Sequence, residues 1–120
     1  MMIELIGDGG HAAVILDLLV ASKSTADGTI IAVGNNRHRQ REALSRGITS
    51  YATLIHPSAI ISPSAYIGPG TVIMAGVIVQ ARAVIGEHCI LNTCCSVDHD
   101  CVVGDFVHVA PGAHLCGTVN

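Results

Sequence analysis

The chain has 120 residues, of which half are hydrophobic and 12% charged, and its formal net charge at pH 7 is −3. Its few basic residues are scattered, which argues against a nucleic acid as the main partner. Every apolar run is shorter than a membrane span, and no basic segment precedes a long apolar one. We therefore expect a cytoplasmic protein of about one domain with a small appendage, neither secreted nor bound in a membrane.

The chain begins with the pattern of a strand, a glycine turn and a helix. An apolar run at 2–6 precedes the turn, and an apolar, helix-compatible segment at 12–20 follows it. Such a turn lets the backbone approach a phosphate closely and directs helix N–H groups at it. Ala12 stands where the full G-x-G-x-x-G pattern has its third glycine, so the motif alone fits a structural turn as well as a ligand site. The turn consists of Gly7, Asp8, Gly9, Gly10 and His11.

A second strand is predicted at 29–33, followed by a polar, basic helix at about 37–45. Asn35 and Asn36 come directly after this strand, at the end where α/β sheets usually bind ligands. Arg37 opens the basic helix and would neutralise a nucleotide phosphate there, although a solvated helix face is the commoner meaning of such a run.

Eleven hexapeptides in unbroken register fill the rest of the chain, from Ile55 to Asn120. Each opens with a branched aliphatic residue, and a small or β-branched residue stands four places later. A fixed internal period is the signature of a solenoid, in which each repeat buries its apolar column against its neighbours. Six residues suit one short strand and a turn, so three units would complete a triangular coil with the openers inside. We predict a parallel β-helix, in preference to a β-sandwich. The openers are Ile55, Ile61, Ile67, Ile73, Val79, Ile85, Leu91, Val97, Val103, Val109 and Leu115.

Three of the five cysteines, Cys89, Cys95 and Cys101, stand four places after an opener, in the column of small or β-branched residues. A thiol packs there as a compact apolar group, so we expect these cysteines to be structural. The sequence has no C-x-x-C pair of the kind that binds zinc or forms a redox dithiol.

Six segments together resemble one bacterial family, which contains the sialic acid O-acetyltransferases and the N-acetyltransferases that act on UDP-linked amino sugars. The match extends over nearly the whole chain. It implies an α/β Rossmann-like subdomain over 1–54 that holds the sugar nucleotide and a left-handed parallel β-helix over 55–120 that holds acetyl-CoA. It also implies a homotrimer with active sites between subunits. The segments are IGDGGH (6–11), AVGNNR (32–37), LIHPSA (54–59), LNT (91–93), VDHD (97–100) and HVAPGA (108–113).

The chain departs from this family in two places. Only 21–28 separates the first helix from the second strand, where family members have a further strand and helix. The hexapeptides stop at Asn120, where relatives continue for several coils. We therefore expect a shortened Rossmann-like subdomain and a β-helix that is incomplete at its C-terminus.

The resemblance also assigns roles to single residues. His99 matches the family's general base, and Asp100 matches an acidic neighbour that orients the imidazole. Asp98, a candidate turn residue, is the rival of Asp100 as that carboxylate. Asn92 matches a residue that hydrogen-bonds the catalytic ring. His108 matches a histidine near the acetyl group, and Gly117 a backbone contact to acetyl-CoA. A base is needed because a sugar hydroxyl or protonated amine attacks a thioester only after losing a proton, and imidazole titrates near working pH.

The expected reaction is therefore direct acetyl transfer from acetyl-CoA to an amine or hydroxyl of a sugar or UDP-sugar, without a covalent enzyme intermediate. We expect the glycine turn and the residues after the second strand to bind the sugar nucleotide, with His11 placed on that side by the resemblance. The predicted contacts are Gly7, Gly9, Gly10, His11, Asn35, Asn36 and Arg37.

Two other interpretations stay open. One is a non-catalytic trimeric β-helix that serves as a scaffold. The other is a zinc-dependent, carbonic anhydrase-like β-helix, for which seven histidines are available. Zinc needs ligands converging within about 2.0–2.1 Å of the metal. His108 and His114 are expected on adjacent faces with diverging side chains, so we predict no metal site.

Overall fold

The computed structural model describes residues 3–22 and 28–120 and contains both patterns that the sequence predicts. The first part comprises β1 (Ile3–Ile6), α1 (Gly10–Ser22), β2 (Gly28–Ile31) and α2 (Asn36–Ser45). Two-residue strands follow, each of which ends on the opener of a hexapeptide. They are β3 (Leu54–Ile55), β4 (Ile60–Ile61), β5 (Tyr66–Ile67), β6 (Val72–Ile73), β7 (Ile78–Val79), β8 (Val84–Ile85), β9 (Ile90–Leu91), β10 (Ser96–Val97), β11 (Val102–Val103), β12 (His108–Val109) and β13 (His114–Leu115).

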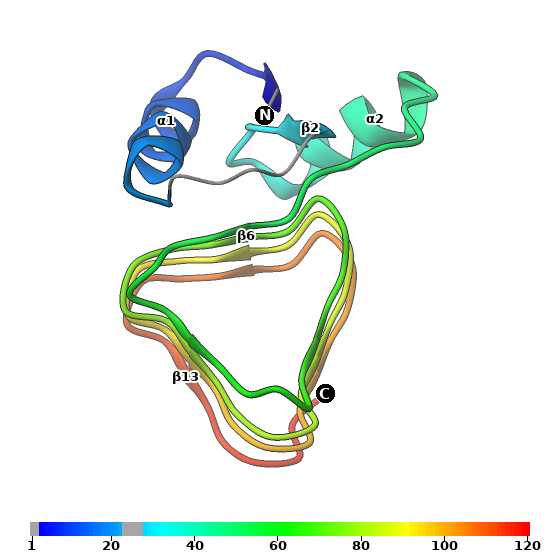
Figure 1. Cartoon of the computed structure of the whole chain (residues 1–120). Coiled ribbons are helices and arrows are strands. Elements are labelled where there is room, and N and C mark those ends of the chain that lie inside the picture. Colours follow the sequence, from blue (N-terminus) through cyan, green and yellow to red (C-terminus); the bar gives the residue numbers. More distant parts are fainter. Residues whose placement is uncertain (1–2, 23–27) are drawn as a thin grey trace.

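The short strands form a parallel β-solenoid of about three turns with a triangular cross-section (Figure 1). From β3 to β10, each strand pairs with the third strand after it, so that Leu54 lies beside Val72 and Ile73 beside Leu91. The three sheets have the orders β3-β6-β9-β12, β4-β7-β10-β13 and β5-β8-β11. The predicted parallel β-helix is confirmed, and the arrangement is consistent with the left-handed form that the resemblance implies.

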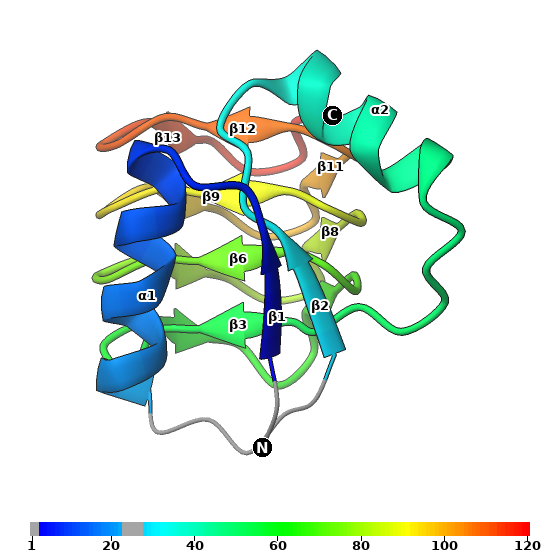
Figure 2. The ribbon, with the colours of Figure 1, turned by 90° about the horizontal axis from the view of Figure 1, so that it is seen from above.

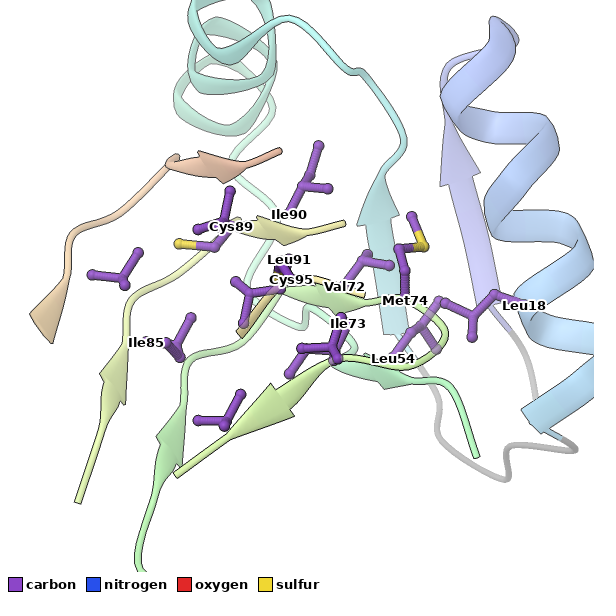
Figure 3. Packing of buried hydrophobic residues seen from close by; sticks show 14 of the residues in the cluster. Leu18, Leu54, Val72, Ile73, Met74, Ile85, Cys89, Ile90, Leu91 and Cys95 are labelled. Atoms are coloured by element: carbon purple, nitrogen blue, oxygen red, sulfur yellow. The ribbon is translucent and has the colours of Figure 1, made fainter. Parts of the chain in front are cut away.

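The interior of the solenoid is filled by the two apolar columns of the repeat (Figure 3). Openers of the middle coils, such as Ile85 and Leu91, are fully buried, and so are Cys95 and Cys101. The prediction that the column cysteines are structural is thereby confirmed. Burial raises the pKa of the Cys95 thiol to about 11, so it stays protonated and apolar. Ile55, in the first coil, is 38% exposed because no earlier coil covers it.

Left-handed backbone conformations turn the chain at the corners of the coil. Arg82, Asp100 and Thr118 occupy one such corner in successive coils, with φ of 60°, 59° and 65°. The Asp100 N–H donates to the Ala81 carbonyl and the Thr118 N–H to the His99 carbonyl, so each corner is tied to the coil before it. Side chains at this corner therefore stack in a column.

The N-terminal unit, consisting of β1, α1, β2 and α2, covers the sheet β3-β6-β9-β12 (Figure 2). β1 and β2 form a parallel pair that runs across the solenoid strands, and an isolated bridge joins Thr29 to Tyr51. Val72 and Ile90, which point outward from the covered sheet, are buried under this unit. The unit is a small β-α-β-α arrangement with a two-stranded sheet, and its description as Rossmann-like stays a prediction.

Some predicted features lie wholly or partly outside the described residues. Met2, the first residue of the predicted strand, is one of them, and so is most of the short connection 21–28, since 23–27 is not described. Across 3–22 and 28–120, no helix is long and apolar enough to span a membrane.

A matched pair of leucine substitutions tests the solenoid core. Leu91 is fully buried in β9, whereas Leu44 on α2 is 75% exposed. Leu91→Ala should lower the free energy of unfolding by about 2–5 kcal/mol, because it removes a packed side chain and leaves a cavity. Leu44→Ala should change it by less than about 0.5 kcal/mol. Urea denaturation of both variants measures the difference, and equal losses would contradict the described core.

Candidate active site

His99 and Asp100 form a side-chain pair on the corner that follows β10. The His99 Nδ1 lies 2.9 Å from Asp100 Oδ2. Asp98, the other carboxylate of this turn, accepts from the backbone N–H of His99 at 2.7 Å and so serves the turn itself. Asp100 is therefore the carboxylate that contacts the ring, in agreement with the predicted pair. When Nδ1 donates its proton to this carboxylate, the lone pair of the imidazole is on Nε2.

Gly117 lies against the free nitrogen of this imidazole. A Cβ added at Gly117 would be 2.6 Å from His99 Nε2 and 2.8 Å from its Cε1, closer than real contacts allow. The two residues stack in successive coils, and glycine is the residue that leaves Nε2 room. Gly117, predicted as a contact of acetyl-CoA, is thus part of the immediate surroundings of His99.

Asn92 has a different partner from the one that the resemblance implies. Its side-chain nitrogen lies 3.0 Å from His108 Nε2, and not against the ring of His99. The geometry of the coils explains this pairing. Asn92 directly follows β9 and His108 begins β12, and these two strands are neighbours in one sheet, whereas His99 stands on the next corner. Asn92 and His108, both predicted site residues, therefore form a pair of their own.

The glycine turn and the end of β2 line a cleft of about 390 Å³, which Gly7, Gly10, His11 and Gly34 help to form. Gly7 has a φ of 121°, and a Cβ there would meet the Ala32 carbonyl oxygen at 2.5 Å, so only glycine fits. The predicted turn residues are thus gathered around one cleft.

His11 is the titratable group of this cleft whose pKa is most displaced. Burial, helped by the nearby Arg39 and His108, lowers its pKa to about 4. Its Nε2 is buried and has no hydrogen-bond partner in the structure. His11 is consequently neutral at neutral pH, and its buried Nε2 is an unpaired polar atom in the wall of the cleft.

The asparagines that follow β2 have structural partners. Asn35 is the N-cap of α2, and its side-chain oxygen accepts from the His38 N–H at 2.9 Å. The side-chain oxygen of Asn36 accepts from Arg39 at 2.8 Å. Arg37 is exposed at the start of α2. Of these three predicted ligands, the two asparagines thus also organise the start of the helix.

Sequence reasoning missed Arg39, which is 1% exposed although it belongs to the basic helix. Its guanidinium donates hydrogen bonds of 2.7–3.3 Å to five acceptors. Two of the acceptors belong to neighbouring coils and two to the end of β2, so Arg39 joins the N-terminal unit to the solenoid. The one hint in the sequence is Ala43, four residues later on the same helix face. The acceptors are the carbonyls of Val33, Gly34, His88 and Phe106 and the side-chain oxygen of Asn36.

In residues 3–22 and 28–120, no three histidine, cysteine, aspartate or glutamate side chains are grouped so that they could hold a metal ion. His108 and His114 belong to different sheets, as predicted, and His114 pairs with Ser96 instead.

No protein-family model and no curated protein matches the sequence. Solved structures do match it. The acetyltransferase domain of PglB from Neisseria gonorrhoeae FA1090 is 36% identical, with a TM-score of 0.85 over 97% of this chain and 74% of that one. A mutant of perosamine N-acetyltransferase from Caulobacter crescentus, in complex with CoA and GDP-perosamine, is 32% identical, with a TM-score of 0.87 over 98% and 72%. The chain belongs to this family of bacterial sugar acetyltransferases.

The family predicted from the six sequence segments is thus confirmed. A further structure of the PglB domain, 35% identical to this chain, contains acetyl coenzyme A. WeeI from Acinetobacter baumannii AYE, at 21% identity and a TM-score of 0.80 over 98% of this chain and 72% of that one, shares the fold.

Arg39→Met tests the junction between the N-terminal unit and the solenoid of this acetyltransferase. The variant keeps the bulk of the side chain but leaves buried carbonyl oxygens without a donor. We expect a loss of about 1–3 kcal/mol in the free energy of unfolding. The control is Arg41→Met, an exposed position of the same helix, which should change stability by less than about 0.5 kcal/mol. If urea denaturation gives equal values for the two variants, Arg39 does not join the two parts.

Proposed function

We propose that this chain transfers an acetyl group from acetyl-CoA to an amine or hydroxyl of a nucleotide-linked sugar, with His99 as the general base. The observation that carries the proposal is the pair of His99 and Asp100, in which Nδ1 faces the carboxylate and Nε2 faces the side-chain-free Gly117. The relatives add support, since one structure contains acetyl coenzyme A and another CoA with GDP-perosamine.

In the proposed reaction, His99 Nε2 removes a proton from the attacking amine or hydroxyl of the sugar. The freed electron pair attacks the thioester carbonyl carbon and forms a tetrahedral intermediate. Its collapse breaks the carbon–sulfur bond, and the proton held by His99 passes to the leaving CoA thiolate. Asp100 stabilises the imidazolium that exists between these two transfers.

The other site residues take supporting roles in this proposal. His108, held by Asn92, and the backbone of Gly117 bind the acetyl-CoA end of the substrates. Gly7, Gly9, Gly10 and His11 bind the sugar nucleotide, which the cleft lined by glycines and the neutral His11 support. The remaining proposed contacts to the sugar nucleotide are Asn35, Asn36 and Arg37.

The proposal divides the chain into a sugar-nucleotide subdomain of Rossmann-like type, 1–54, and a left-handed β-helix, 55–120. It places the enzyme in the cytoplasm. The five cysteines, which are all free in the structure, favour that compartment because thiols stay reduced there.

We further propose that the enzyme is a homotrimer. The sheet β3-β6-β9-β12 is covered by the N-terminal unit, but the other two sheets present exposed apolar side chains to solvent. Tyr66, Val84 and Val102 form such a column on β5-β8-β11. His99 stands on the corner between these two uncovered sheets. A neighbouring subunit on this side would bury the apolar column and also shield the site from water.

Light scattering tests the trimer directly. We expect a particle of three times 12.4 kDa. Val102→Glu should dissociate it, because a carboxylate in an apolar interface loses its hydration. The control Gln40→Glu adds the same charge on the exposed surface of α2 and should leave the trimer intact. A stable monomer with full activity would contradict the proposal.

The decisive test of function is His99→Ala, assayed by CoA release with nucleotide-linked amino sugars and sialic acids as acceptors. We expect kcat to fall by roughly 10²–10⁴-fold, the usual effect of losing a general base. Asp100→Asn should cost less, and His56→Ala, a histidine on a distant turn, should have no effect. Near-normal turnover in a folded His99→Ala variant would remove His99 from the mechanism. A folded chain that binds no acetyl-CoA in calorimetry would favour the scaffold interpretation.

A further inference from the structure

We propose that Arg82 is a positioning residue of this site, which acts on His99 by holding the carboxylate of Asp100. The inference rests on the proposed function, in which His99 is the base. Sequence reasoning gave Arg82 no role, and it lies 17 residues before His99 in the chain.

Arg82 binds both carboxylate oxygens of Asp100. Its Nε donates to Oδ1 at 2.7 Å, and its Nη2 donates to Oδ2 at 2.8 Å. The same Oδ2 lies 2.9 Å from Nδ1 of His99. One carboxylate oxygen therefore connects the guanidinium to the imidazole, and the guanidinium fork determines the orientation of the carboxylate plane.

The coil places Arg82 where it can make this fork. Arg82 and Asp100 occupy the same corner in successive coils, 18 residues apart. The backbone at both positions is held, since the Arg82 N–H donates to the Ser64 hydroxyl at 3.0 Å and the Asp100 N–H donates to the Ala81 carbonyl. The two side chains thus start from backbone positions that the solenoid itself determines.

An orienting group is needed because the pair is on the surface. The side chain of His99 is 54% exposed and that of Asp100 is 34% exposed. An isolated ion pair with such exposure is weak, because water competes for both partners and the side chains sample other rotamers. A carboxylate gripped at both oxygens cannot rotate away from the ring without breaking two charge-assisted hydrogen bonds.

Arg82 binds the ionised form of Asp100. Its hydrogen bonds, followed by that of His99, hold the pKa of the Asp100 carboxyl well below its usual range. An aspartate is ionised at neutral pH even without such partners, so what Arg82 adds is the orientation of the carboxylate toward His99 Nδ1, which leaves the lone pair on Nε2. Arg82 itself is 67% exposed, so its contribution to folding is small and its loss should affect turnover in a folded protein.

A double-mutant cycle on the full chain tests this inference. Arg82→Met keeps much of the side-chain length but removes the charge and the donors. We expect it to lower kcat by about 10-fold, on the order of a misplaced catalytic group, and to change both KM values by less than about 2-fold. In the Asp100→Asn background, the same substitution should cost little further activity, because its route to His99 is already broken. Asparagine suits this test since it tolerates the positive φ of residue 100.

Two further variants sharpen the result. Arg82→Lys keeps the charge but cannot form the bidentate fork, so it should recover only part of the lost kcat. Arg46→Met is the matched control, because Arg46 also pairs with a carboxylate on the surface, that of Glu42, but far from the site in the fold. It should leave kcat unchanged.

The outcomes separate this inference from the proposed function. Normal turnover in His99→Ala would remove the function, whereas a large loss there with no loss in Arg82→Met would remove only the role of Arg82. Equal losses from Arg82→Met in both backgrounds, or a raised KM for acetyl-CoA at unchanged kcat, would show that Arg82 contacts the substrate directly.

The ring nitrogens of His99 give a second measurement that does not depend on turnover. The ¹⁵N chemical shifts of the imidazole, assigned by comparison with His99→Ala, report which nitrogen carries the proton at high pH. In the unsubstituted chain we expect the Nδ1–H tautomer to dominate. Arg82→Met should shift the population toward Nε2–H, and an unchanged spectrum would overturn the inference even if no acceptor sugar is found.

Discussion

The stacking of one coil directly on the next determines the rest of this structure. Every strand of the solenoid pairs with a strand one coil away, so side chains separated by 18 residues lie on top of each other. Inside the solenoid this produces continuous apolar columns, which bury residues such as Ile85 and Leu91 completely. At the corners it produces columns of polar side chains. The same rule that packs the core therefore puts Arg82 under Asp100 and Gly117 against His99.

The sequence predicts those features that depend on the repeat or on close neighbours in the chain. The period of six predicts the parallel solenoid. The resemblance supplies Asp100 as the partner of His99, since adjacency alone fits Asp98 equally well. The partner of Asn92 and the fork of Arg82 were missed, because both depend on which positions share a face or a corner in successive coils. Arg39 was missed for another reason. Its burial is favourable only because carbonyl groups from two other parts of the fold converge on it, and within the helix only Ala43, on the same face, distinguishes it from Arg41.

The N-terminal unit depends on the solenoid for its own core. Its two strands form only a two-stranded sheet, which is marginal in water without another apolar layer. The outward side chains Leu54, Val72 and Ile90 supply that layer. Arg39 then fixes the end of β2 to the carbonyls of neighbouring coils. The cleft around His11 consequently has a fixed place relative to His108, which adds to the lowering of the His11 pKa by burial and by Arg39.

A left-handed backbone at a corner is a property of this solenoid and does not by itself mark Arg82. Gly70, Gly76 and Gly112 have φ of 70–79°, but His88, Cys94, Phe106 and Thr118 adopt the same conformation with a side chain. The conformation costs a residue with a Cβ about 1–2 kcal/mol, and the packing of the coils must offset that cost at each of these corners. What distinguishes Arg82 is the pair of hydrogen bonds that it donates to Asp100. Because both side chains are partly exposed, these hydrogen bonds contribute more to the orientation of His99 than to the stability of the fold.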